Sequence, residues 1–232
     1  MAHSIRAERP VAFKIDVVSD VVCPWCYIGK HSLDAALARL AADDPGFAVT
    51  VNWHPFQLSP DVPPGGVERN AYIEAKLGGV ARVKEAHDVV REVGRAAGVT
   101  FDFGRIRVQP NTLAAHRLVS YIQHDHDAGD LVERLFAAFF VDGRDVGDKA
   151  VLANIAEEAG FDRAAAAAFL DGDEGAAAIA GMERHMRELG VQGVPFFVFD
   201  GRLAVSGAQS GEAILALIQE AREVKVEAVD NA

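Results

Sequence analysis

The chain has 232 residues, half of them hydrophobic, which is enough for a sizeable core and argues against a disordered protein. Lysine and arginine number 23 against 34 aspartates and glutamates, so the formal net charge is −11. A chain this acidic repels phosphate backbones and anionic lipids, and we therefore expect neither nucleic acid nor a membrane surface as a partner.

The first strand-like segment is preceded by MAHSIRAERP, which lacks the apolar core of about 7–15 residues found in a signal peptide. No run of about 18 apolar residues, the length needed to span a bilayer, occurs later in the chain. We therefore expect a soluble protein of the cytoplasm.

The first sixty residues predict a strand, a helix and a second strand. Hydrophobic side chains stand at every second position of residues 11–18, VAFKIDVV, which is the period of a strand. Leucines and an isoleucine then recur at helical spacing over residues 25–41, with Pro24 in the first turn, where its missing N–H costs nothing. Residues 47–56, FAVTVNWHPF, predict the second strand, and together these elements indicate a right-handed βαβ unit.

Helical patterns dominate from residue 60 to about residue 190. The expected helices cover residues 70–77, 82–97, 112–124, 130–141, 149–159, 163–170 and 174–189. Strand character returns in VPFFVFDGRLAVSGAQ, where Asp200 and Gly201 separate two apolar runs and predict a hairpin. Ser210 then caps a last amphipathic helix. Neither end has enough strands for a stable sheet, so we expect one sheet built from both ends, with a helical block inserted between them.

Both cysteines of the chain lie in the stretch Cys23-Pro24-Trp25-Cys26. A structural clip is a weak interpretation, because a bond between residues so close removes little entropy from the unfolded chain. Zinc is also weakly supported, because it takes four ligands and no second cysteine pair exists; His124 and His126 alternate with aspartates in what reads as a solvated turn. A redox couple remains, and a C-x-x-C beside a βαβ pattern is typical of thioredoxin-like chemistry.

The predicted strand-to-helix junction gives the two thiols different tasks. Cys23 would stand at a helix N-terminus, where unpaired N–H groups favour the thiolate that attacks a disulfide. Cys26, one turn further on, could then attack the mixed disulfide and release the substrate. A second signal is Pro195 before an apolar strand, which is either a strand-opening residue or part of a cis turn.

Four segments resemble the DsbA-like thioredoxin-fold oxidoreductases, and among them the cytoplasmic FrnE-type group. They are SDVVCPWCYIGK, WHPFQLSP, PNTLAAHRL and GVQGVPFFVFDGRLAVSGAQ. The resemblance implies an α/β thioredoxin fold (βαβ…ββα) with a large all-helical insertion domain. We expect residues 1–60 and 190–225 to form the thioredoxin-like domain, residues 61–189 the insertion, and residues 226–232 a flexible tail.

The resemblance also implies a DsbA-family protein disulfide oxidoreductase. In this family Cys23 would be the exposed nucleophile and Cys26 the resolving thiol. The Val194-Pro195 bond would be cis and lie against the cysteine pair, and the Val194 backbone would pair with an extended substrate chain. Pro24 and Trp25 between the cysteines complete the expected site.

Two departures from the exported relatives bear on the direction of electron flow. Those relatives have Pro-His between their cysteines, whereas this chain has Pro24-Trp25, so its redox strength stays open. The cytoplasm keeps thiols reduced, which favours isomerase or reductase activity over net oxidation. A glutathione-dependent isomerase or transferase, of the kappa-class or 2-hydroxychromene-2-carboxylate isomerase type, is the alternative. A serine usually replaces the first cysteine there, so the presence of both cysteines favours dithiol chemistry.

Four further residues are candidates for lining the cleft, namely His54, Phe56, Asn111 and His116. Each has a structural alternative: Phe56 may belong to the core, His54 to a surface turn, Asn111 to a helix cap and His116 to a buried backbone contact. We expect no metal and no tightly bound cofactor, with glutathione as a candidate co-substrate. The expected substrates are disulfide-containing proteins or small thiols, and a homodimer is left open.

Overall fold

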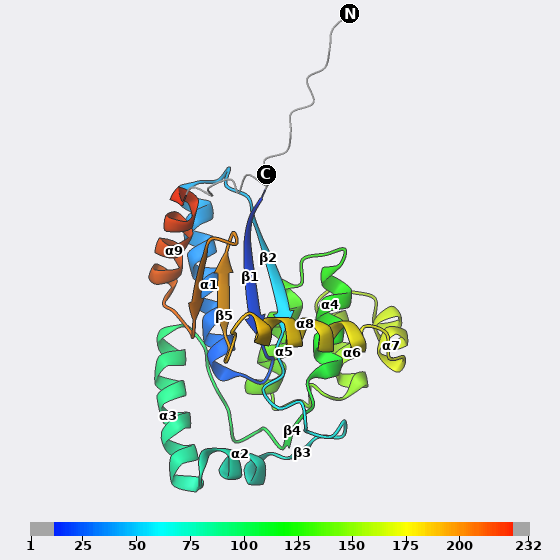
Figure 1. Ribbon diagram of the computed structural model, residues 1–232. Coiled ribbons are helices and arrows are strands. Elements are labelled where there is room, and N and C mark those ends of the chain that lie inside the picture. Colours follow the sequence, from blue (N-terminus) through cyan, green and yellow to red (C-terminus); the bar gives the residue numbers. More distant parts are fainter. Residues whose placement is uncertain (1–11, 225–232) are drawn as a thin grey trace, which may run out of the picture.

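A computed structural model of the chain describes residues 12–224, so the flexible tail expected at residues 226–232 lies outside the described residues (Figure 1). Its main sheet contains β1 (Phe13–Ser19), β2 (Val49–Pro55), β5 (Phe196–Phe199) and β6 (Leu203–Ser206) in the order β2-β1-β5-β6. β1 pairs parallel with β2, whereas β5 is antiparallel to both β1 and β6. Strands from the two ends of the chain thus share one sheet, as the sequence predicts.

The central position of β1 follows from its side chains. Ile15 and Val17 are at most 2% exposed and face Val51 and Trp53 on one side and Phe199 and Phe197 on the other. The hairpin between β5 and β6 turns at Asp200 and Gly201, both with positive φ (51° and 67°). These are residue types that tolerate the left-handed region, and the predicted hairpin is confirmed.

Helix α1 (Pro24–Asp43) crosses between the first two strands and packs against α9 (Gly211–Glu223), beside the sheet (Figure 1). Its approach to β5 depends on Gly29, because a Cβ there would lie 3.1 Å from the Phe197 ring and 3.2 Å from the Pro195 side chain. A larger residue at position 29 would push α1 away from Pro195.

The remaining helices lie between β2 and β5 in sequence. In Figure 1, α4 to α8 gather beside β2, whereas α2 and α3 lie apart from them near the start of α1. Their bounds are α2 (Arg69–Leu77), α3 (Val80–Ala96), α4 (Leu113–Gln123), α5 (Gly129–Phe140), α6 (Lys149–Glu158), α7 (Arg163–Asp171) and α8 (Ala176–Glu188). The fold is therefore the expected thioredoxin-like α/β fold with a helical insertion, and the domain limits assigned above stay a prediction.

Two short strands were not expected. β3 (Val67–Glu68) and β4 (Val108–Gln109) form a separate antiparallel pair. Two residues are too few to show a strand period, so the pattern could not reveal them. Among residues 12–224, no helix has the length and apolar character that crossing a bilayer requires.

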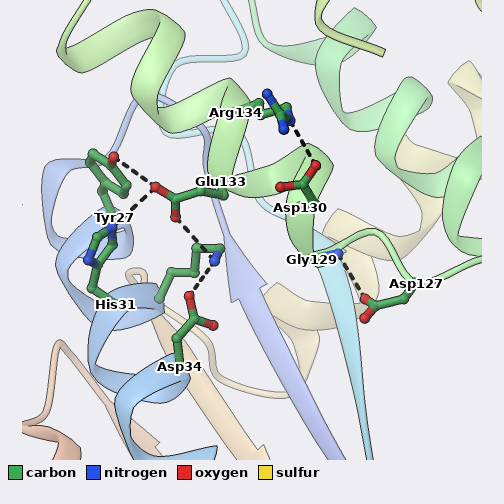
Figure 2. Close-up of polar contacts among 9 residues, drawn as sticks. Tyr27, His31, Asp34, Asp127, Gly129, Asp130, Glu133 and Arg134 are labelled. Atoms are coloured by element: carbon green, nitrogen blue, oxygen red, sulfur yellow. Dashed lines mark hydrogen bonds and ion pairs between the residues drawn. The ribbon is translucent and has the colours of Figure 1, made fainter. Parts of the chain in front are cut away.

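A cluster of charged and polar groups joins α1 to α5, with Glu133 at its centre (Figure 2). The Glu133 carboxylate accepts a hydrogen bond from the Tyr27 hydroxyl (3.0 Å) and lies 3.2 Å from His31 Nε2. The buried Lys30 ammonium lies 3.1 Å from Glu133 and 2.5 Å from Asp34. Burial raises the pKa of Glu133, but the hydrogen bond with His31 and the charge of Lys30 outweigh it and lower that pKa to about 2.

Substituting Glu133→Gln is expected to lower the free energy of unfolding at pH 7 by about 1–2 kcal/mol. The full pKa shift implies more, but 29% of this side chain is exposed and solvent screens its charge. Because the folded-state pKa is depressed, the stabilisation is present above the unfolded pKa of 4.5 and disappears as the pH falls toward 2. Urea unfolding at several pH values would measure it.

The matched control is Asp130→Asn, one turn earlier on α5, where an exposed carboxylate pairs with Arg134 at 2.7 Å (Figure 2). That pair should contribute less than about 0.5 kcal/mol. A Glu133→Gln protein as stable as wild type at pH 7, or a deficit that persists unchanged below pH 4, would contradict the role given to Glu133.

Candidate active site

The two cysteines stand at the junction between the end of β1 and the start of α1. Cys23 is the N-cap residue of α1, with extended backbone angles (φ −93°, ψ 114°), and Pro24 occupies the first turn as predicted. The Cys23 carbonyl accepts from the N–H groups of Cys26 (3.1 Å) and Tyr27 (3.2 Å). This first turn of the helix brings the two side chains together, and both are free thiols.

The loop that carries Pro195 lies against Cys23 from the other end of the chain. The Val194-Pro195 peptide bond is cis, as the resemblance implies. The Val194 carbonyl oxygen accepts a hydrogen bond from the Cys23 thiol at 3.5 Å, across 171 residues of sequence. The expectation of an exposed nucleophile needs correction: Cys23 is only 4% exposed, because the Val194 backbone lies beside its sulfur.

Cys26 is the more buried of the two, at 2% exposure. Burial raises the pKa of its thiol well above the ordinary value, and the neighbouring Cys23 raises it further. The Asp20 backbone and the nearby Ser19 hydroxyl oppose this increase in pKa to a smaller extent. Cys26 is therefore protonated at neutral pH in the dithiol, and it can act as a nucleophile only after something removes its proton.

A buried carboxylate and a buried imidazole lie behind the cysteine pair. Asp20 is 1% exposed and its Oδ2 accepts from the Leu58 N–H at 2.8 Å. Its Oδ1 lies 3.4 Å from Nε2 of His116, which is 5% exposed. The pair is therefore within ion-pair distance but lacks a well-aligned hydrogen bond.

Several polar atoms around this pair have no hydrogen-bond partner among residues 12–224. They are Ser19 Oγ, Asp20 Oδ1, His116 Nε2 and Trp53 Nε1. Ser19, Trp53 and His116 also line a cavity of about 20 Å³. A space of that size has room for one water molecule, and buried polar atoms are normally satisfied by such waters.

Two of the other predicted residues support the site from behind. Phe56 is 2% exposed and packs with Val18 and Val191 in a small cluster that Val194 also contacts. Asn111 donates from Nδ2 to the Val62 carbonyl (2.6 Å) and accepts at Oδ1 from the Leu113 N–H (3.0 Å). It thus joins the loop after β2 to the beginning of α4. Its contact resembles the capping alternative considered above, but the N-cap position itself is Thr112, whose side chain makes no capping hydrogen bond.

The side chains of His54 and Trp25 lie in different environments. His54 Nε2 lies 2.8 Å from Asp16 Oδ1, and within residues 12–224 no hydrogen bond links its side chain to either cysteine. Trp25, between the cysteines, is partly exposed and lines two cavities, of about 190 and 320 Å³, which lie near α2 and near the start of α9 respectively. Of the predicted residues, the structure thus gathers Pro24, Trp25, Val194 and Pro195 around the cysteines. His54 and His116 line the 20 Å³ cavity behind them, together with Ser19.

The sequence analysis missed three polar residues at or next to the site, and a fourth, Glu133, in the cluster that joins α1 to α5. Asp20 and Ser19 lie in the motif that carried the resemblance, and a charged residue at the end of an apolar strand is a signal that could have revealed Asp20. Arg69 and Glu133 carry no comparable signal, because each reaches its place through the packing of the inserted helices on α1.

Comparison with known proteins identifies the family of the chain and several proteins of similar structure. The DSBA-like thioredoxin domain matches residues 14–219 of the chain. A probable DsbA oxidoreductase from Streptomyces coelicolor has a similar structure, with 28% identity, a TM-score of 0.82 and coverage of 94% of both chains. YwbO of Bacillus subtilis is 27% identical over 150 residues, which is 65% of this chain and 68% of YwbO.

A more distant structural neighbour is the cytosolic disulfide reductase DsbM from Pseudomonas aeruginosa, solved with and without GSH. The GSH-containing structure is 20% identical, with a TM-score of 0.58 and coverage of 90% of this chain and 95% of that one. At this level of identity the likeness shows a shared fold and no more.

Proposed function

Because the chain belongs to the DSBA-like thioredoxin domain family, we propose that it is a thiol–disulfide oxidoreductase whose redox pair is Cys23 and Cys26. The observation that carries the proposal is the meeting of the two free thiols at the start of α1 with the backbone of the cis Val194-Pro195 loop. A metal or structural role for the cysteines would leave this contact across the chain without a purpose.

In the first step, the Cys23 thiolate attacks one sulfur of a substrate disulfide. The S–S bond breaks, its electron pair leaves with the second sulfur as a thiolate, and a mixed disulfide forms between Cys23 and the substrate. The Val194 carbonyl, which accepts from the Cys23 thiol in the free protein, becomes available when that proton is lost. Val194 would then present its backbone to an extended substrate chain.

In the second step, Cys26 attacks the Cys23 sulfur, the substrate leaves as a thiol, and the disulfide between residues 23 and 26 forms. Burial holds the Cys26 pKa high, so this step needs a proton acceptor. We assign the acceptor to the Asp20 and His116 pair. The proton would pass by way of the Ser19 hydroxyl and a water molecule in the adjoining 20 Å³ cavity.

We place the protein, within the family, in the cytoplasmic FrnE-type group. In a compartment that keeps thiols reduced, the cycle runs as a reductase or isomerase, with glutathione or another small thiol restoring the dithiol. The DsbM structure, named as a cytosolic disulfide reductase and solved with GSH, supports this direction by analogy of fold. Disulfide-bearing proteins and small disulfides are the proposed substrates, and no metal or tightly bound cofactor takes part.

Reduction of insulin disulfides in glutathione buffer, together with refolding of a scrambled disulfide protein, tests the proposal. We expect the wild-type chain to accelerate at least one of the two reactions well above the buffer alone. Rates equal to the buffer background in both assays would refute the proposed function.

A further inference from the structure

One of the two cavities lined by Trp25 contains a buried cation that has no carboxylate partner in the described part of the chain. This cavity, here called the Arg69 pocket, has a volume of about 190 Å³. One wall consists of Val22, Pro24 and Trp25, the residues that flank Cys23 in sequence. Arg69, at the start of α2, forms part of the opposite wall. A ligand here would therefore lie beside the turn that carries Cys23.

Arg69 is 7% exposed, yet its guanidinium has few partners. Nη1 donates to Gln109 Oε1 at 2.7 Å, and the Phe139 ring lies 6.0 Å away. Within residues 12–224, no carboxylate lies within ion-pair distance of Arg69. Burial lowers its pKa to about 10, so it is still a cation at neutral pH. A buried charge without a counter-ion is costly, and arginine binds planar carboxylates with two parallel hydrogen bonds.

The Arg69 pocket is also lined by two other basic side chains, Lys76 and His87. Lys76 stands on its rim and donates to Ser59 Oγ (3.0 Å) and to the Tyr72 hydroxyl (3.1 Å), with no carboxylate in the lining. The neighbouring His87 is neutral at pH 7, because burial first and then the charge of Arg69 lower its pKa to about 4. In a chain of net charge −11, the lining of this pocket is positively charged, which favours an anion.

The remaining walls are apolar. Val90 and Phe103 face the cavity, together with Ile73, Leu77 and the Trp25 ring. The volume lies below that of typical sites for drug-sized ligands, so it suits a single small group. An anion with a hydrated surface would gain little from such walls, whereas an aromatic or branched aliphatic acid would bury its body against them.

We propose that the Arg69 pocket binds the carboxylate of a small aromatic or aliphatic thiol or disulfide, so that the sulfur of that ligand meets Cys23. The inference rests on the proposed function and narrows its substrate class to acidic disulfides with an apolar body. The reaction itself is unchanged: the dithiol loses two electrons and two protons, and the substrate disulfide takes them up and becomes two thiols.

Two aromatic disulfides, one anionic and one uncharged, provide the test. The reagent 5,5′-dithiobis(2-nitrobenzoate) carries one carboxylate on each ring, whereas 4,4′-dithiodipyridine is uncharged at neutral pH. Stopped-flow rate constants with both reagents give a ratio for each variant, which cancels changes in the reactivity of Cys23. For Arg69→Gln we expect the ratio of the nitrobenzoate to the pyridine rate constant to fall about ten- to a hundredfold.

Two more variants keep the result interpretable. Lys76→Gln changes an exposed residue that cannot endanger folding, and it should lower the same ratio severalfold. Arg107→Gln removes an exposed positive charge next to Arg69 in the fold but outside the pocket lining, and it should leave the ratio within twofold of wild type.

Different outcomes would refute the pocket proposal and the proposed function. If both reagents react normally but neither Arg69→Gln nor Lys76→Gln changes the ratio, the pocket proposal is wrong and the proposed function stands. An equal fall in Arg107→Gln would assign the effect to the general field and would also overturn the proposal. If neither reagent reacts with the wild-type chain faster than with a chain lacking Cys23, the proposed function itself fails.

Discussion

Replacing Cys23 with serine is expected to reduce the catalysed rate of disulfide reduction by about a thousandfold or more, to the uncatalysed background. The serine hydroxyl keeps the size of the thiol and can still donate to the Val194 carbonyl, so the site should keep its shape. It cannot form the mixed disulfide, and Cys26 cannot replace the lost nucleophile, because burial raises its pKa and keeps its thiol protonated. Insulin reduction and reaction with an aromatic disulfide would both measure the loss.

Thermal unfolding of the Cys23→Ser protein serves as the control. Both thiols are free in the folded chain, so we expect a midpoint close to that of the reduced wild type. Activity that survives the substitution in a correctly folded protein would show that the chemistry lies elsewhere in the molecule.

Replacing Cys26 with serine should have a different result: the first step proceeds and the second cannot. With oxidised glutathione or a disulfide protein, we expect the Cys26→Ser chain to accumulate a mixed disulfide on Cys23. Mass spectrometry under non-reducing conditions would detect it, and multiple-turnover activity should fall by about two orders of magnitude or more. Retention of full turnover would favour the glutathione-dependent isomerase or transferase alternative, which needs only one reactive side chain at this position.

The role assigned to Asp20 and His116 predicts how the second step responds to pH. Substituting His116→Gln should slow release of the substrate from the mixed disulfide about tenfold near pH 7. The deficit should shrink as the pH rises toward the Cys26 pKa, because a thiol that ionises unaided no longer needs an acceptor. Substituting the exposed His124→Gln should leave this step unchanged. A deficit that is the same at every pH would indicate a structural role for His116.

The sequence predicts the fold well because its elements are strongly periodic and sharply bounded. The alternation in β1, the Asp200-Gly201 turn and the aspartates that begin α6 and α7 each act locally. Asp148 and Asp162 accept hydrogen bonds from the first backbone N–H groups of these two helices, which fixes where the helices start. Local signals of this kind need no knowledge of the tertiary structure.

The site could be predicted only in part. The cysteines and Pro195 stand out in the sequence, but the 4% exposure of Cys23 depends on a loop 171 residues away. The surroundings of His54 also needed the structure, because Asp16 on the adjacent strand holds its imidazole beside the cavity that Ser19 and His116 line. Arg69 could not be found at all, since its surroundings are formed by residues far along the chain, Gln109 on β4 and Phe139 on α5.

A redox titration of the dithiol tests the central claim most directly. The chain is equilibrated with glutathione buffers of graded potential and quenched with a thiol-blocking reagent. Mass spectrometry then gives the fraction of the chain that is oxidised. We predict one two-electron transition that ends in a disulfide between Cys23 and Cys26, and no such transition in Cys23→Ser or Cys26→Ser. A chain whose thiols both stay reduced, or that ends as a stable glutathione adduct without the internal disulfide, would contradict the account.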